Sequence, residues 1–239
     1  MQPAAPSDIP FDPGIPADSG AGSNRGSHRP WATQLMAINV AKALTVLLLL
    51  ALAWVYGLES YRQVIYVSLH VGYCLWWLGE QWLFPQRRRY IFTEPVNVAG
   101  FVAVLLFVGG LYTLPGYLAF TNSQPISLGA VAVALPLYSF GSLINTSADV
   151  QKMTAKELGV GLVSDGIWRS VRHVNYLGDL MRYLSFSVVA GSVWAFVIPA
   201  LIALLYLQRI SQKEQAMAAK YSDFEAYQQR SVRLIPWLW

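Results

Sequence analysis

Charged residues are scarce in this chain. Asp, Glu, Lys and Arg make up 13% of its 239 residues, about half the share found in a soluble globular domain. Hydrophobic residues make up 55%, and several runs are long enough to cross a bilayer. This composition excludes an ordinary soluble enzyme and predicts an all-α, polytopic integral membrane protein.

Cysteine is almost absent. The one residue of this type, Cys74, lies in an apolar run, which excludes an intrachain disulfide framework. In the same run, His70 is interpreted as a packing histidine, so we expect no metal site. Common soluble-enzyme signatures are also missing, including the Walker loop, GxGxxG after a strand, HExxH and GxSxG.

The N-terminal segment, residues 1–33, is rich in Pro, Gly, Ser and Asp. Such a composition cannot bury a core, so we expect a disordered tail. It lacks a basic start followed by an apolar region, and therefore does not resemble a secretory signal peptide.

Four membrane spans are expected between residues 34 and 144, and we expect them to line a substrate cavity. They run over about 35–56, 64–84, 96–120 and 127–144. Three arginines in the segment 86–89 mark a cytoplasmic loop, whereas the link 121–126 carries no charge. The net charge of +4 is thus explained by orientation in the membrane, and no nucleic-acid partner is expected.

The last apolar run, residues 180–207, decides the topology of the C-terminal region. A single helix would place the basic tail 208–239 across the membrane from the polar segment 145–179. Gly191-Ser192 near the middle of the run favours two half-helices of about 12 residues that form a hairpin. The chain would then have five or six membrane segments, with residues 145–239 forming cytoplasmic cofactor-binding segments and the hairpin. The tail pattern KEQAMAAKYSDFEAYQQR predicts a cytoplasmic helix.

The polar segment ends in an unusually dense stretch, DGIWRSVRHVNYLGD, over residues 165–179. One interpretation is an interfacial anchor, with Arg, Trp and Tyr among lipid headgroups. The interpretation that we favour is the mouth of a site for a large, anionic, partly aromatic ligand. The side chains concerned are Trp168, Arg169, Arg172, His173, Asn175, Tyr176 and Asp179.

The residue types in these segments suit binding of an anion. Lys152 and Lys156 share a helix face and, with Arg172 and Arg209, could clamp phosphates, although the two lysines could equally touch lipid phosphates. Trp168 offers a ring for stacking. A carboxylate that enters an apolar run, as Asp179 does, needs a partner.

Residues 166–179, GIWRSVRHVNYLGD, resemble the signature of the NADPH-dependent sterol reductases of the delta-14 and delta-7 group, which includes the lamin B receptor. The resemblance extends to Lys152 and Lys156 upstream and to Arg209, Tyr227 and the Arg233-Leu234-Ile235-Pro236 ending downstream. It covers about the last 95 residues of the chain. Membrane methyltransferases of the isoprenylcysteine carboxyl methyltransferase type share the Arg-His pair but lack the Gly-Asp pair.

This resemblance implies a membrane reductase that protonates a carbon–carbon double bond and adds hydride from NADPH. The acid would be Glu214, because Lys213 stands where the family usually has an acidic residue. The residues that it implies for cofactor binding are Lys152, Lys156, Trp168, Arg172, His173, Asn175, Tyr176, Asp179, Arg209 and Tyr227.

Three hypotheses follow. The first is NADPH-dependent reduction of a sterol-like or isoprenoid lipid in a bacterial inner membrane or endoplasmic reticulum, with the cofactor site facing the cytoplasm. The second is a methyltransferase that uses S-adenosylmethionine on a lipid or prenylated substrate. The third is a membrane protein that binds lipids or partners without catalysis.

Overall fold

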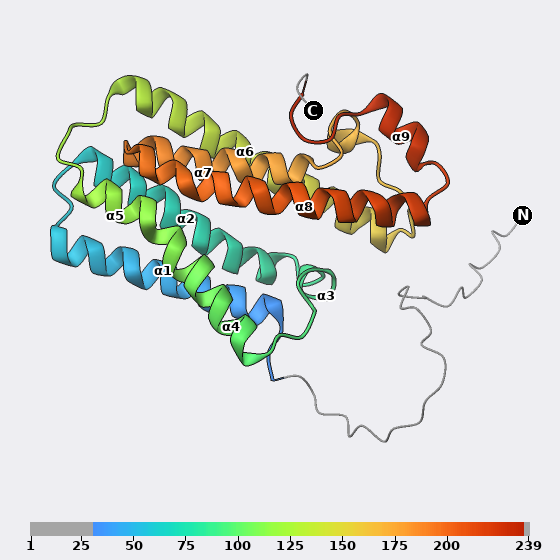
Figure 1. Ribbon diagram of the computed structural model, residues 1–239, viewed down its shortest axis with the longest axis horizontal. Coiled ribbons are helices and arrows are strands. Elements are labelled where there is room, and N and C mark those ends of the chain that lie inside the picture. The colour runs from blue at the N-terminus through green and yellow to red at the C-terminus, as the bar shows by residue number, and fades with distance from the viewer. Residues whose placement is uncertain (1–30, 237–239) are drawn as a thin grey trace, which may run out of the picture. The chain divides into compact units, whose positions relative to one another are not determined.

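The computed structural model describes residues 31–236, whose helices are arranged as Figure 1 shows. Most of the expected disordered tail and the end of the chain lie outside the described residues. Within them there is no β-strand, so the all-α expectation is confirmed. The helices are α1 (Gln34–Tyr56), α2 (Tyr61–Leu83), α3 (Arg87–Tyr90), α4 (Val98–Val104), α5 (Leu114–Thr121), α6 (Leu128–Glu157), α7 (Val174–Ala190), α8 (Val197–Lys220) and α9 (Phe224–Arg230).

Four helical segments are long and apolar enough to cross a membrane: Gln34–Tyr56, Val98–Thr121, Leu128–Glu157 and Val193–Lys220. The chain is therefore a polytopic membrane protein. Large apolar side chains such as Trp54 and Leu47 point outward, as they do where a helix faces lipid. The expected span at 64–84 is α2, which is not among these four segments.

The segment Val98–Thr121 is not one regular helix. A π-helical turn (η1, Leu105–Gly110) and a 3₁₀ turn (η2, Leu111–Thr113) separate α4 from α5. A Cβ added to Gly109 would lie 2.9 Å from Leu44 Cδ2, so glycine lets α1 approach closely without displacing that side chain. The irregular backbone packs against α1, with Gly109 and Tyr112 buried, and membranes tolerate such backbone where protein covers it.

The expected hairpin is present, with its turn at Gly191. This residue ends α7 in the left-handed conformation, with φ +66°, which glycine adopts without strain. The buried guanidinium of Arg62 donates a hydrogen bond of 2.5 Å to the carbonyl of Val189 and holds the turn. The two arms are longer than the expected 12 residues, at 17 for α7 and 24 for α8, because both helices continue into the polar segments.

The expectation of one continuous tail helix is wrong. Helix α8 ends at Lys220, and α9 starts at Phe224 after a turn. The turn lets Phe224 and Tyr227 pack inward, where each is 1% exposed. At the other end of the polar segment, α6 runs uninterrupted past residue 144, so the boundary drawn there does not coincide with a break in the chain.

Candidate functional site

The two polar segments that flank the hairpin lie against each other. The backbone N–H of Arg172 donates to the carbonyl of Val232 at 2.9 Å, and that of His173 donates to Arg233 at 3.0 Å. Val171 and Val232 form an isolated parallel bridge. Figure 1 shows α9 beside the loop that precedes α7. The tail therefore returns to the end of the bundle where the polar segment lies, as the hairpin requires.

An ion-pair cluster around the buried carboxylate of Glu214 stabilises this junction. The carboxylate of Glu214 is 2.8 Å from Arg172 Nε and 2.9 Å from Arg233 Nε, and His173 Nε2 lies 3.4 Å away. Arg172 also donates to the carbonyls of Gln228 and Ser231. We call Arg172, His173, Glu214 and Arg233 the Glu214 cluster. Its contacts link the residues just before α7 to α8 and to the segment after α9, and so stabilise the fold.

His173 is 3% exposed, and its environment favours the neutral imidazole. Burial lowers its pKa to about 4, although the nearby carboxylate of Glu214 opposes the shift. The ring also stacks on Tyr176, with 5.8 Å between centroids. A neutral, enclosed histidine at the start of α7 supports the local fold.

The segment that contains Trp168 packs against the segment that contains Tyr227. The Trp168 indole is 4% exposed and donates to the carbonyl of Ala148 at 3.2 Å. The Tyr227 hydroxyl donates to the carbonyl of Trp168, and burial raises the pKa of this phenol to about 12. Both predicted binding residues therefore have internal partners, and Trp168 is enclosed apart from the cation above its ring.

That cation belongs to a face of positive charges on α6 and α8. Lys152 Nζ lies 5.0 Å from the centre of the Trp168 ring, and Lys213 Nζ lies 4.8 Å from that of Tyr176. Lys152 is repelled by Lys213 and Lys156 and attracted by Asp149. We call Lys152, Lys156, Arg209 and Lys213 the cation face. All are at least partly exposed, so the face is open to an anion.

Next to the cation face is a stack of tyrosines above a carboxylate. The rings of Tyr176 and Tyr206 are parallel, with centroids 4.2 Å apart. The Tyr206 hydroxyl donates to Asp179 at 3.0 Å, and Arg182 forms an ion pair with the same carboxylate. The partner that the sequence required for Asp179 is thus Arg182 together with Tyr206. The half-buried Asn175 offers its backbone carbonyl to Asn145 at 3.0 Å.

Deeper in the bundle, one more set of polar residues was missed by the sequence reasoning. Lys42 of α1 lies 4.1 Å from the centre of the Tyr73 ring and 5.4 Å from that of Tyr112. The Tyr73 hydroxyl is 3.1 Å from that of Tyr183. The signal in the sequence is a lysine within an apolar run, a position from which a long side chain commonly snorkels to the membrane interface. Lys42 is instead 2% exposed and faces the protein interior.

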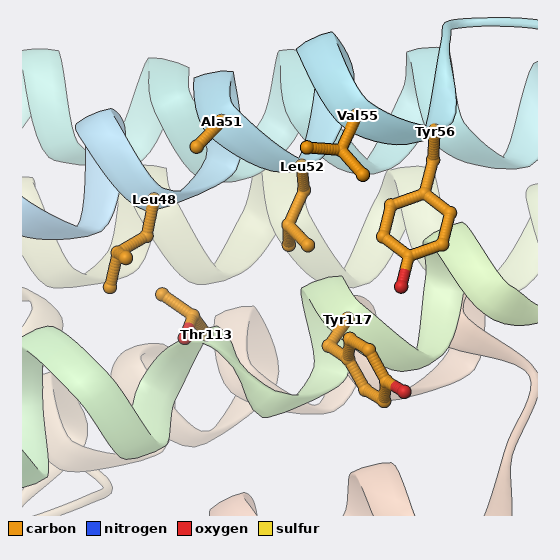
Figure 2. A pocket seen from close by; sticks show the side chains of 7 residues that line it. All are labelled: Leu48, Ala51, Leu52, Val55, Tyr56, Thr113 and Tyr117. Carbon is orange, nitrogen blue, oxygen red and sulfur yellow. The ribbon is translucent and has the colours of Figure 1, made fainter.

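Two cavities lie at the opposite end of the bundle, near the turn of the hairpin. The apolar one, of about 370 Å³, lies between α1 and α5 and is lined by residues from both (Figure 2). The second, of about 460 Å³, lies between the links that follow α1 and α5. Among residues 31–236, no group of three or more His, Cys, Asp or Glu could hold a metal ion.

Residues 28–231 match the protein family described as "Protein of unknown function (DUF1295)", and the chain belongs to this family. It is also homologous to sterol reductases. It is 29% identical to a Delta(14)-sterol reductase of Arabidopsis thaliana over 156 residues, 58% of this chain and 42% of the relative. It is 26% identical to the Delta(14)-sterol reductase TM7SF2 of Mus musculus over 198 residues, 72% of this chain and 45% of the relative. The chain thus spans less than half the length of these relatives.

Proposed function

We propose that this protein is a membrane-embedded, NADPH-dependent reductase of a carbon–carbon double bond in a sterol-like or isoprenoid lipid. The observation that carries the proposal is the meeting of the cation face with the Tyr176–Tyr206 stack, at the end of the bundle where the tail rejoins the chain. Homology to Delta(14)-sterol reductases supports the reaction type.

The residues present fit a dinucleotide phosphate. Lys152, Lys156 and Lys213 repel one another, and an anion with several charges would relieve this repulsion. Lys152 and Lys156 would hold the phosphates, and Arg209 would complete the face. Tyr176 and Asp179, further along α7, would position the ribose or nicotinamide end. When bound, the dihydronicotinamide supplies a hydride.

The side of the membrane follows from charge. Trp76 and Glu80 of α2 contact Thr146 of α6, so α3, which follows α2, lies at the end of the bundle that carries the cation face. The exposed Arg88 and Arg89 of α3 add positive charge there. Positive residues collect in cytoplasmic loops, so we infer that the cofactor site faces the cytoplasm.

Glu214 as the proton donor stays a prediction. Both of its carboxylate oxygens contact guanidinium groups, at 2.8 and 2.9 Å. These two contacts hold the carboxylate in place and leave it away from any cavity described above. The geometry therefore favours an anchoring role for this residue over transfer of a proton.

Binding of NADPH, NADH and S-adenosylmethionine to the purified protein in detergent tests the proposal. We expect NADPH to bind most tightly, with an affinity that falls as salt rises. Lys152→Ala with Lys156→Ala should weaken it at least about tenfold, since each phosphate loses a charged partner. Arg89→Ala, an exposed cation outside the face, is the matched control.

The other two functions are outcomes of the same experiment. Binding of S-adenosylmethionine alone, unaffected by the two lysine substitutions, would indicate a methyltransferase, because that cofactor has no phosphate. Binding of none of the three would favour a module without catalysis. Unchanged NADPH binding in the double lysine variant would remove the cation face from the proposal.

A further inference from the structure

Lys42 is a buried lysine within a membrane-spanning helix. It is 2% exposed, and its contacts within the described residues are with the rings of Tyr73 and Tyr112. None of the ion pairs formed between described residues includes it. A cation inside a bilayer is costly and is retained mainly where it has a function. Lys42 therefore marks a site that the cation face does not explain.

The rings around Lys42 include a pair of hydroxyl groups. Tyr73 and Tyr183 share a hydrogen bond of 3.1 Å, and the guanidinium of Arg182 lies 4.5 Å from the centre of the Tyr73 ring. Two cations therefore lie over one phenol. When a phenol loses its proton, the charge spreads over the ring, and cations above the ring stabilise it.

The hydroxyl pair lies one helical turn beyond the carboxylate that we assign to the cofactor. Tyr183 follows Asp179 by four residues on α7, which puts the two side chains on the same helix face. Arg182 links them, since it forms an ion pair with Asp179 and covers the ring of Tyr73. A group held between Asp179 and Tyr183 would have a hydride donor on one side and a phenol on the other.

One residue that lines the apolar cavity is the sequence neighbour of a ring that contacts Lys42. Thr113 of η2 lines the cavity (Figure 2). Tyr112, which precedes it in the chain, has its ring centre 5.4 Å from Lys42 Nζ. Five of the other lining residues come from the second half of α1 and are mostly aliphatic, and the sixth, Tyr117, comes from α5. A volume of about 370 Å³ is in the range of small-molecule sites and suits part of an elongated lipid.

We propose that the Tyr73–Tyr183 hydroxyl pair is the proton donor of the reduction, and that Lys42 and Arg182 are positioning residues that hold the charge left on the phenol. This inference rests on the proposed function. The O–H bond of one phenol breaks, and a C–H bond forms at one carbon of the alkene. The neighbouring carbon accepts the hydride of the dihydronicotinamide, which is oxidised. Water then returns a proton to the phenolate.

The test compares variants of the full chain in detergent micelles, with NADPH and a sterol that carries a 14,15 double bond as probes. The double variant Tyr73→Phe/Tyr183→Phe and the single variant Lys42→Met should lower kcat by about 100-fold or more, the value of a general acid. KM and the Kd for NADPH should stay within about twofold. Tyr61→Phe is the control, since Tyr61 is 81% exposed.

Two further readouts separate chemistry from packing. Lys42→Arg restores the cation and should recover at least about a tenth of the wild-type kcat, and the wild-type reaction should slow about twofold or more in D₂O. Turnover within about threefold of wild type in both the tyrosine and Lys42→Met variants would overturn the inference. So would parallel losses of NADPH binding and thermal stability, which would indicate packing alone.

The outcomes also separate this inference from the function on which it rests. If Lys42→Met does not fold, the tyrosine double variant decides, because Phe preserves the ring. A wild-type protein that binds NADPH and reduces the sterol, with variants equally active, contradicts the inference only. A wild-type protein that does neither removes the proposed function and this inference together.

Discussion

Two regions of the molecule each contain a buried charge, but the groups that contact these charges differ. In the Glu214 cluster, one buried carboxylate contacts Arg172 and Arg233. Lys42 is buried to a similar extent, but its contacts within the described residues are with aromatic rings. Paired charges such as those of the Glu214 cluster stabilise a fold. A buried cation without an acidic partner is costly and indicates a function. The following predictions test this difference.

The largest effect is expected at Glu214. Glu214→Gln removes the only acidic member of the cluster and leaves two guanidinium groups facing each other, which should cost about 3–5 kcal/mol of unfolding free energy. Thermal unfolding in detergent measures it, with the exposed Glu225→Gln as the control. If Glu214→Gln were as stable as wild type and bound NADPH but did not reduce the sterol, Glu214 would be the catalytic acid and the comparison would fail.

Acid should destabilise the same region through His173. The unfolded chain takes up this proton near pH 6.5, but the folded protein takes it up only near the lowered pKa of about 4. The contribution of His173 to the free energy of unfolding is therefore complete above pH 6.5. It is lost as the pH falls towards 4, and about 2 kcal/mol of it is lost at pH 5. Unfolding measured between pH 7 and 5 should show this loss in wild type and a smaller one in His173→Asn. If the free energy of unfolding fell equally with pH in both proteins, this role of His173 would be contradicted.

Asp179 belongs to neither region alone, because it joins the tyrosine stack to Arg182. Asp179→Asn keeps the shape but removes the charge, so we expect NADPH binding to weaken about tenfold while membrane insertion is unchanged. Binding titrations measure the effect, and the exposed Asp223→Asn is the control. Normal binding and turnover would show that Asp179 serves only to pair Arg182.

The smallest effect is expected for a neutral hydrogen bond in the structural region. Tyr227→Phe leaves the carbonyl of Trp168 without its donor, at a cost of about 1 kcal/mol in unfolding free energy. NADPH affinity should be unchanged, because the hydroxyl faces the protein interior. A loss of affinity without a loss of stability would instead place Tyr227 in the cofactor site, as the family resemblance implies.

The sequence predicted the fold well where long-range rules apply. Composition indicated an all-α membrane protein, and the basic tail together with Gly191 indicated the hairpin. It failed where packing decides. The tail has good helix formers throughout, yet the burial of Phe224 and Tyr227 requires a turn before α9. Local helix propensity is a weak guide when tertiary contacts compete with it.

The candidate site was predicted from residue types, and the type of a residue does not say which other side chains it contacts in the folded protein. Arg172 and Lys152 were both expected to bind phosphate, but only the structure shows that Arg172 is occupied by Glu214. Lys42 was missed for the same reason. Its neighbours Tyr73 and Tyr183 are separated by 110 residues in the chain, so no local pattern brings them together.

The central claim is that the polar segments before and after the hairpin meet on one side of the membrane. Its most direct test is a disulfide between Val171→Cys and Val232→Cys, which form the bridge between the segments, with Cys74 replaced by serine. Mild oxidation of native membranes should cross-link the pair in high yield. If the pair does not cross-link and the two cysteines react with impermeant thiol reagents from opposite sides of the membrane, the segments share no site and the account is wrong.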